Sequence, residues 1–524
     1  MFGFKSLKWI VCALGALGAL GALIGVGCTQ TPSSSSIEKS LRFQLVNEPL
    51  SLDPTFAEDG VALEVLTNTS DGLVGYDGSG QLQNRLAESY RISTDGKTYR
   101  FVLRSSGRWS DGRPIKAQDF VTAFRRALSP HSLSKLAPLF YPIRGARLYQ
   151  QNKIPEQELG VREEEGTLVI ELEYPAPYFI QALTLPPSFP LRQDILSKHQ
   201  GNWPESGPVT GPYQVVTHSL DQKLILERNP YYYGEQPKIA RVEMIIIGDE
   251  STGLNLFENG RLDLLTRVPY LDLRRLKEAG KILSTPILTT YYLSFNCRRP
   301  PFNDLKWRRA FAGAIRRNEI AALLDPSLTP AWSWIPPGLE GSLAYQDPSL
   351  IFEDSMAWVR KNHQAQTQPV TASFDTGIRN SKILEKVQYD IQQRLGVSLQ
   401  LTHLDWKTYL RSLQVDPPSL FRLGWMAAFK DPISHLKVFT KNEANNYSGC
   451  FNMRYDQLVS EIEKMKPGMK RAQKIKVAQK ILLEEMAAVV PIYHYIQNTG
   501  VSSRIKGFRM NPFGLILFKE LDLE

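Results

Sequence analysis

The stretch FRLGWMAAFKDP, residues 421–432, is the most informative segment of this chain. It concentrates large apolar and aromatic side chains, and we expect it to contain an apolar strand. It lies in a half of the chain where predicted strands and helices alternate. The strands are expected at residues 370–374, 398–401 and 489–495, and the helices at 381–395, 406–413, 455–465 and 470–486. Alternating elements of these lengths predict an α/β fold with mixed β-sheets flanked by helices.

The first half of the chain is richer in β-structure. Alternating and β-branched residues predict strands at residues 41–46, 97–104, 168–172, 223–227, 242–247 and 262–265. Helices are predicted at 118–128 and 251–259, and a third runs from a cap at Asn303 or Asp304 through Ile315. Four arginines fall mostly off the apolar stripe of this third helix, and we expect them to face solvent; they are Arg308, Arg309, Arg316 and Arg317.

The first 27 residues have the pattern of a signal peptide. Lys5 and Lys8 precede an uncharged apolar run, residues 9–26, which is too short to span a bilayer. Residues 25–28, GVGC, look like a bacterial lipobox, in which Cys28 receives a lipid and becomes the mature amino terminus. An ordinary secretory signal that is cut nearby is the alternative. Residues 28–36 are rich in serine and are predicted to form a flexible tether.

The composition argues against several classes of protein. The net charge is +9, but basic residues are scattered among acidic ones, without the aromatic-interleaved stripe of a nucleic-acid binder. The chain has no GxSxG, HExxH or GxxxxGK motif, and neither CxxC nor HxxxH occurs. We therefore predict neither an enzyme nor a metal or cofactor site. Cys297 and Cys450 either pair as a disulfide in an oxidising compartment or stand as separate buried thiols.

A set of short segments resembles one family in the same order along the chain, the family 5 extracellular solute-binding proteins of ABC-type oligopeptide and dipeptide importers. Besides residues 421–432, the segments are SLDP at 51–54, LAES at 86–89, WSDG at 109–112, AQDF at 117–120, GPY at 211–213, LERNPYY at 226–232, PFND at 301–304 and DWKTY at 405–409. No single segment is decisive, but their order is specific. The resemblance extends from residue 41 to about residue 508.

The resemblance implies a two-lobed fold of the periplasmic-binding-protein type II class with an extra third domain. By that pattern, residues 37–70, 191–285 and 496–524 form lobe I, and residues 286–495 form lobe II. Residues 71–190 form the extra domain. Two crossing segments would make a hinge, and the ligand would be buried when the lobes close.

The resemblance also implies which residues contact a ligand. An extended peptide has unpaired backbone groups, which strand edges can satisfy, and residues 58–61 and 424–426 match the stretches that do so in the family. Tryptophans would wall the side-chain pockets. The residues implied are Glu58, Gly60, Trp406, Gly424, Trp425 and Met426. Each of three residues also has an alternative role. Glu58 is then a solvated carboxylate, Trp425 is a core residue, and Gly424 relieves crowding within its strand.

Three further positions concern the polar groups of the ligand. Arg422 matches an arginine that pairs with a ligand carboxylate, and a structural salt bridge is the alternative. Ala428 stands where the family usually has an acid that anchors the free amino group of the peptide. Unless Asp431, Glu58 or another carboxylate substitutes, we expect a peptide-like ligand with a blocked, displaced or additional acidic end. His494 lies in a strand similar to a cleft-lining segment, and a core histidine is the other reading.

The resemblance implies a bacterial oligopeptide-binding lipoprotein, a monomer in the periplasmic space that is anchored to a membrane through its lipid. It would capture oligopeptides or peptide-like molecules and deliver them to the permease and ATPase of an ABC importer. Two alternatives remain: the same scaffold binding a metal chelate, haem or another anionic solute, and a surface adhesin or sensor that has lost transport.

Overall fold

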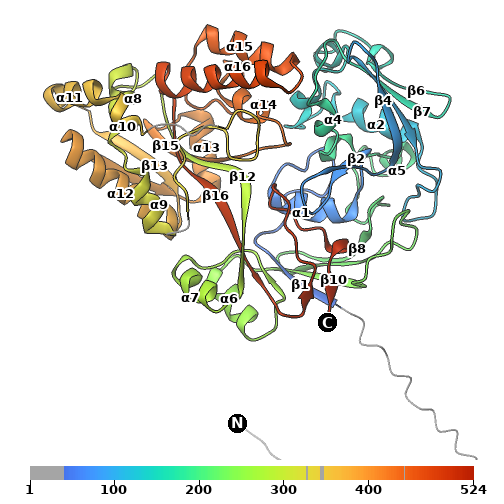
Figure 1. Ribbon diagram of the computed structural model, residues 1–524. Coiled ribbons are helices and arrows are strands. Elements are labelled where there is room, and N and C mark those ends of the chain that lie inside the picture. Colours follow the sequence, from blue (N-terminus) through green and yellow to red (C-terminus); the bar gives the residue numbers. More distant parts are fainter. Residues whose placement is uncertain (1–39, 326–327, 343–346, 367, 442) are drawn as a thin grey trace, which may run out of the picture. The chain divides into compact units, whose positions relative to one another are not determined.

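The computed structural model describes residues 40–325, 328–342, 347–366, 368–441 and 443–524. Its largest feature is one mixed ten-stranded sheet with the strand order β14-β13-β15-β12-β16-β11-β1-β10-β9-β8 (Figure 1). The strands are β1 (Ser40–Leu45), β8 (Tyr213–Ser219), β9 (Lys223–Arg228), β10 (Arg241–Ile246), β11 (Leu264–Leu265), β12 (Ile282–Phe295), β13 (Val370–Asp375), β14 (Leu399–Leu404), β15 (Leu420–Met426) and β16 (Val489–Val501).

Two long antiparallel strands, β12 and β16, connect the two halves of this sheet (Figure 1). At one end Ile282 pairs with Gly500, and β16 also pairs with the short strand β11 there. At the other end β12 pairs with β15 on its second edge, with Tyr291 opposite Gly424. The β12–β16 register is irregular between Pro286 and Thr290. The pair is therefore a continuous backbone link between two separate groups of strands.

A second, antiparallel sheet is built from an earlier part of the chain. Its strand order is β4-β5-β7-β6, with β4 at Ala87–Ile92, β5 at Thr98–Leu103, β6 at Val161–Glu164 and β7 at Thr167–Glu171. The helix α2 (Ala117–Ala127) buries Phe120 and Phe124 in the same core cluster as Tyr99 and Phe101 of β5. A small hairpin, β2 (Val74–Tyr76) with β3 (Leu82–Asn84), precedes this sheet.

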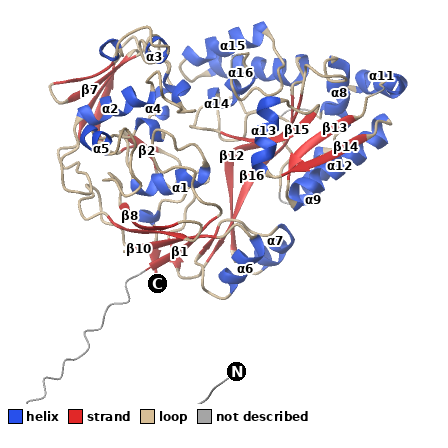
Figure 2. Cartoon of the chain, turned by 180° about the vertical axis from the view of Figure 1, so that it is seen from behind, coloured by secondary structure: helices blue, strands red, loops and turns tan. Residues whose placement is uncertain are grey.

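Helices cover the strands in local groups (Figure 2). The remaining α-helices of six or more residues are α1 (Gly60–Thr69), α5 (Gln193–Lys198), α6 (Glu250–Glu258), α7 (Leu273–Glu278), α8 (Leu305–Ala314), α9 (Arg317–Leu324), α11 (Glu353–Asn362), α12 (Ile378–Leu395), α13 (Trp406–Val415), α15 (Met453–Lys464) and α16 (Met469–Lys480). Helices α8, α9, α11 and α12 share one core cluster with β12 and β13, as their apolar stripes predict. Helices α6 and α7 form a smaller cluster with β11.

Most of the predicted elements are present, with ends shifted by a few residues. Residues 421–426 of the apolar strand expected within 421–432 belong to β15. Asp304 caps α8 by accepting a hydrogen bond from the Lys306 amide at 2.8 Å. The helix expected at 470–486 is α-helical only to Lys480, after which residues 481–485 form a π-helical turn. Strand β12 is the clearest omission, because its fourteen residues lack a simple alternation.

The prediction that four arginines of one helix face solvent is partly wrong, and Arg317 belongs to the separate helix α9. Arg308 and Arg317 are buried, and their guanidinium groups donate hydrogen bonds to backbone carbonyls: Arg308 to Met486 and Arg317 to Pro491. These carbonyls lie just after the π-helical turn and at the start of β16, so Arg308 connects α8, and Arg317 connects α9, to that segment. Arg316 is exposed, as expected.

Several predictions concern residues that the structure does not describe. The signal peptide at 1–27, the tether at 28–36 and the lipid-bearing Cys28 all lie outside the described residues. Among the helices that are described, none combines the length and the apolar character needed to cross a bilayer. Cys297 and Cys450 are joined as a disulfide, with 5.2 Å between their Cα atoms.

Candidate ligand-binding site

A cavity of about 410 Å³ lies where several distant segments of the chain meet. Its wall comes from α1, the β2 hairpin, residues 135–139 and 184–189, the segment from Gly424 to Asn445, and the C-terminal residues 511–517. Cavities of several hundred cubic ångströms that are enclosed by side chains from different elements are typical ligand sites. This cavity is the candidate ligand-binding site.

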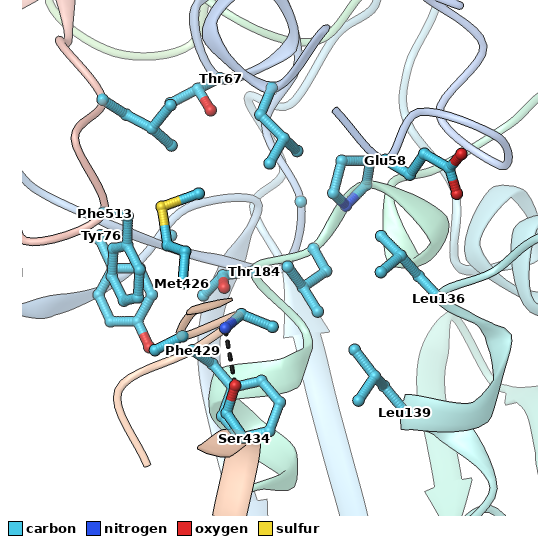
Figure 3. Close-up of a pocket in the computed structure, with 18 of the residues that line it drawn as sticks. Glu58, Thr67, Tyr76, Leu136, Leu139, Thr184, Met426, Phe429, Ser434 and Phe513 are labelled. Atoms are coloured by element: carbon cyan, nitrogen blue, oxygen red, sulfur yellow. Dashed lines mark hydrogen bonds between the residues drawn. The ribbon is translucent and has the colours of Figure 1, made fainter. Parts of the chain in front are cut away.

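The wall of the cavity is mostly apolar. In Figure 3, Leu136 and Leu139 lie on the opposite side of the cavity from Tyr76 and Phe513, and Met426 lies beside the last two. Apolar side chains from the other segments complete the surface; they are Leu63, Val74, Pro138, Leu185, Pro186, Phe189, Val438, Leu515 and Leu517. Such a surface favours ligands that bring apolar side chains, because binding removes both surfaces from water.

The end of β15 offers a free strand edge at this cavity. One edge of β15 pairs with β12 throughout, whereas β13 pairs with the other edge only at Leu420 and Phe421. At the next residue the Tyr409 hydroxyl replaces a strand partner. It accepts a hydrogen bond from the Arg422 amide at 3.1 Å and donates one to the Arg422 carbonyl at 2.7 Å. Beyond that point no strand in the described part of the chain pairs with this edge. Gly424–Met426 line the cavity and are accessible to solvent, so their backbone can pair with an added strand.

Trp425 and Gly424 both line the cavity, and their contacts bear on the alternative roles given above. The Trp425 indole donates a hydrogen bond to the Ser434 carbonyl at 2.9 Å while its ring lines the cavity. A Cβ atom added at Gly424 would approach the Tyr495 hydroxyl to 3.4 Å, an ordinary contact. Relief of crowding is therefore a weak explanation for this glycine.

Ala428 lies in the cavity wall, and its amide donates a hydrogen bond to the Ser434 hydroxyl at 2.8 Å (Figure 3). The neighbouring Lys430 does not point its charge into the cavity, because its ammonium donates to the Gly80 carbonyl at 3.3 Å. Asp431 is buried and forms an ion pair with Arg471 at 2.7 Å. Asp431 is therefore not the carboxylate that could substitute for an acid at position 428.

Glu58 lines the cavity, but its carboxylate points away from the centre in Figure 3 and pairs with Lys135 at 2.5 Å. The extended backbone expected at residues 58–61 is not formed. Gly60 is the first residue of α1, and the Val61 amide donates to the capping Asp59 carboxylate at 3.0 Å. A helix N-terminus does not present a strand edge, and Gly60 as a ligand contact stays a prediction.

Arg422 and His494 lie outside the set of described residues that line the cavity. Arg422 is largely buried, forms an ion pair with Asp375 at 2.5 Å and places its guanidinium 5.2 Å from the centre of the Tyr291 ring. The structural salt bridge, the alternative reading of Arg422, is thus the arrangement observed. The His494 ring is bonded to the Thr290 hydroxyl at 3.0 Å, and burial lowers the pKa of this histidine to about 4.

Trp406 is also outside the cavity wall. It is the first residue of α13, capped by Asp405, and half of its surface is exposed to solvent. The sequence thus brings Glu58, Gly424, Trp425, Met426 and Ala428 together at the cavity, and separates Gly60, Trp406, Arg422 and His494 from it.

Sequence reasoning missed most of the apolar wall and five charged residues of the lining, which are Asp71, Arg85, Lys135, Lys437 and Glu443. No motif marks these residues, because each contributes one side chain from a segment whose own pattern is that of a strand end, a turn or a loop. The run of residues that follows β15 could have directed attention only to Lys437 and Glu443. In the described part of the chain, no three His, Cys, Asp or Glu side chains gather as metal ligands would.

Comparisons with known proteins agree with this geometry. Residues 81–447 match the model of the bacterial extracellular solute-binding proteins, family 5. The chain is 29% identical to the oligopeptide-binding protein of Bacillus subtilis, over 92% of each chain. It is 28% identical to a probable deoxycholate-binding periplasmic protein of Escherichia coli, over 99% of this chain and 98% of that one.

Among solved structures, the murein tripeptide binding protein of Escherichia coli is similar to this chain, with a TM-score of 0.84 at 25% identity. The similarity covers 93% of this chain and 99% of that one. The two-lobed α/β fold is therefore shared along almost the whole length of the chain.

Proposed function

Because this chain belongs to family 5 of the bacterial extracellular solute-binding proteins, we propose that it is the ligand-capturing component of an ABC-type peptide importer. It holds an oligopeptide or a peptide-like molecule in the cavity bounded by β15, α1 and the C-terminal segment. The free edge of Gly424–Met426 is the observation that carries this proposal. A strand edge that opens into a ligand-sized cavity bonds to the backbone of a peptide whatever its side chains are.

The domain division follows from the same family relationship. Lobe I consists of residues 37–70, 191–285 and 496–524, lobe II of residues 286–495, and the extra domain of residues 71–190. The antiparallel sheet of β4, β5, β6 and β7 supports a separate domain at 71–190, and the β12–β16 pair supports a hinge near residues 286–290. Closing of the lobes around the ligand is then the working step, without chemistry on the ligand.

The cellular setting is also part of the proposal. A signal peptide at 1–27 directs the chain out of the cytoplasm, a lipid on Cys28 anchors it, and residues 28–36 tether the monomer to the membrane. A permease and an ATPase receive the ligand. A disulfide between Cys297 and Cys450 fits an oxidising compartment.

The cavity wall suggests how the ends of the ligand are held. Ala428 has only a methyl group at the position where the family usually has an acid that binds the amino group of the peptide. The nearby Asp431 carboxylate already forms an ion pair with Arg471. A free ammonium next to Ala428 would lose water without gaining a counter-charge, which costs several kcal/mol. The ligand therefore has an amino end that is blocked or placed elsewhere in the cavity.

Isothermal titration calorimetry of the purified mature protein tests this function. The probes are Ala-Ala-Ala and Leu-Leu-Leu, each free and N-acetylated, with deoxycholate as a non-peptide probe. We expect saturable binding of one peptide per chain, tighter for the leucine peptides because of the apolar wall. Binding of deoxycholate alone, or of no peptide in any form, would contradict the proposal.

A further inference from the structure

Three carboxylates belong to the described lining of the cavity, and two of them are neutralised within the protein. Glu58 pairs with Lys135 at 2.5 Å. Asp71 accepts hydrogen bonds from the hydroxyl groups of Tyr232 and Tyr233, at 3.1 and 2.8 Å, and lies 3.9 Å from the Arg85 guanidinium. These two carboxylates have little capacity left for a charged ligand.

The third carboxylate, Glu443, differs from the other two. Among the described residues it takes part in no ion pair, and the hydrogen bond that its carboxylate accepts from the side-chain amide of Asn445 is relatively long, at 3.3 Å. The charge of Lys437, which also lines the cavity, acts on Glu443, but the Lys437 ammonium is bonded to Glu463 at 2.9 Å. Of the three carboxylates, Glu443 is therefore the one that forms no ion pair with a described residue.

The surroundings of Glu443 make this arrangement costly for the empty protein. The residue is half-buried, and burial raises the pKa of its carboxyl group, an effect that the charge of Lys437 only partly offsets. A carboxylate that has lost part of its hydration gains most from a partner that carries the opposite charge. A cation that enters the cavity with the ligand would supply that partner.

We propose that Glu443, assisted by Asn445, is the specificity-determining residue of this cavity and receives a positively charged group of the ligand, an ammonium or a guanidinium. This inference rests on the proposed function, which supplies the peptide-like ligand. The cation binds at a position fifteen residues beyond Ala428, so the ligand carries its charge on a displaced amino end or on a side chain. The apolar wall meanwhile holds its neighbouring side chains.

Two pairs of tripeptides test the proposal by calorimetry. One pair is Ala-Ala-Ala and its N-acetyl form, in which the charge is at the amino end. The other is N-acetyl-Lys-Ala-Ala and N-acetyl-norleucine-Ala-Ala, in which a side chain carries the charge. The wild-type protein should bind the cationic member of at least one pair ten or more times as tightly as the neutral member. Glu443→Gln should abolish that preference and leave the affinity for the neutral member within about twofold.

The matched control is Glu461→Gln, which removes one negative charge from an exposed carboxylate that pairs with Lys474 outside the cavity. This variant should keep the wild-type preference. Thermal unfolding of all three proteins shows whether the variants are folded. No preference in the wild type, or a preference that survives in Glu443→Gln, would overturn the inference and leave the proposed function standing. Failure of every peptide to bind would overturn both.

Discussion

At position 428 the cavity wall carries only a methyl group, and the backbone amide beneath it is held by Ser434. Replacement of this residue tests whether the amino end of a peptide comes near it. We expect Ala428→Asp to tighten the binding of Ala-Ala-Ala about tenfold, because the new carboxylate pairs with the ammonium. The affinity for N-acetyl-Ala-Ala-Ala should not rise. Calorimetry measures both, and Ala428→Asn is the neutral control. An equal gain for both peptides would show that charge pairing is not the cause.

The buried His435 provides a pH-dependent test. Neither ring nitrogen has a hydrogen-bond partner among the described residues, and burial lowers the pKa of His435 to about 3. The unfolded chain takes up a proton near pH 6.5, whereas the folded chain does not until about pH 3. The free energy of unfolding should therefore be intact above pH 6.5 and fall as the pH is lowered, by about 2 kcal/mol at pH 5 from this residue.

His435→Phe should flatten this acid limb, because phenylalanine cannot bind a proton. Urea unfolding at pH 7.5 and pH 5 gives the two free energies for each protein. His131→Phe, a substitution at an exposed histidine, is the control and should keep the wild-type slope. If His435→Phe lost as much free energy of unfolding between pH 7.5 and pH 5 as the wild type does, His435 would not be the cause of the acid sensitivity. His494, whose pKa is about 4, adds a smaller loss in the same direction.

At the scale of elements, the loop that follows β15 is fixed by the buried ion pair of Asp431 and Arg471. Arg471 also pairs with Glu340 at 2.6 Å, and the Asp431 carboxylate accepts from the Ile433 amide at 2.9 Å, at the start of α14 (Ile433–Leu436). Asp431→Ala should lower the free energy of unfolding by about 3 kcal/mol, because a buried guanidinium loses one of its two counter-charges.

The same variant should not change the ratio of affinities for free and N-acetylated peptides, because Asp431 does not line the cavity. Chemical unfolding and calorimetry give the two quantities. Glu461→Ala, which breaks an exposed ion pair with Lys474, should change stability by less than about 0.5 kcal/mol. A lost amine preference in a fully stable Asp431→Ala protein would mean that Asp431 contacts the ligand.

The disulfide between Cys297 and Cys450 ties the segment after β12 to the segment before α15. It closes a loop with a sequence separation of 153 residues, so it restricts the unfolded chain strongly. Replacement of both cysteines by alanine should lower the free energy of unfolding by about 2–5 kcal/mol. A reducing agent should destabilise the wild type by a similar amount and leave the variant unchanged. Equal stability with and without the reductant in the wild type would contradict this.

Sequence reasoning predicted elements well and the cavity only in part. Strands such as β7, β10 and β15 and helices such as α12 have patterns that follow from local periodicity. Arg308 and Arg317 were misplaced because their partners are carbonyls far along the chain. The position of a long side chain in such a network depends on tertiary structure, which the charge pattern of one helix does not contain.

The cavity shows the same limit at the scale of the whole molecule. Its wall consists of single side chains from segments that are far apart in the sequence, such as those of Leu63, Leu139 and Phe513. No local sequence pattern therefore predicts the cavity. The family resemblance located the part contributed by residues 424–428 because that part is continuous in sequence. The sequence around Glu443 does not distinguish it from other carboxylates, because its lack of an ion pair with a described residue depends on the tertiary structure.

We propose that the cavity captures a peptide through the free edge of Gly424–Met426. Mass spectrometry of the small molecules released when the natively purified mature protein is denatured tests it most directly. We predict short peptides or peptide-like molecules at up to one per chain, with fragment masses that report amide-linked residues. A released steroid or another molecule without amide bonds, present at one per chain, would contradict peptide capture.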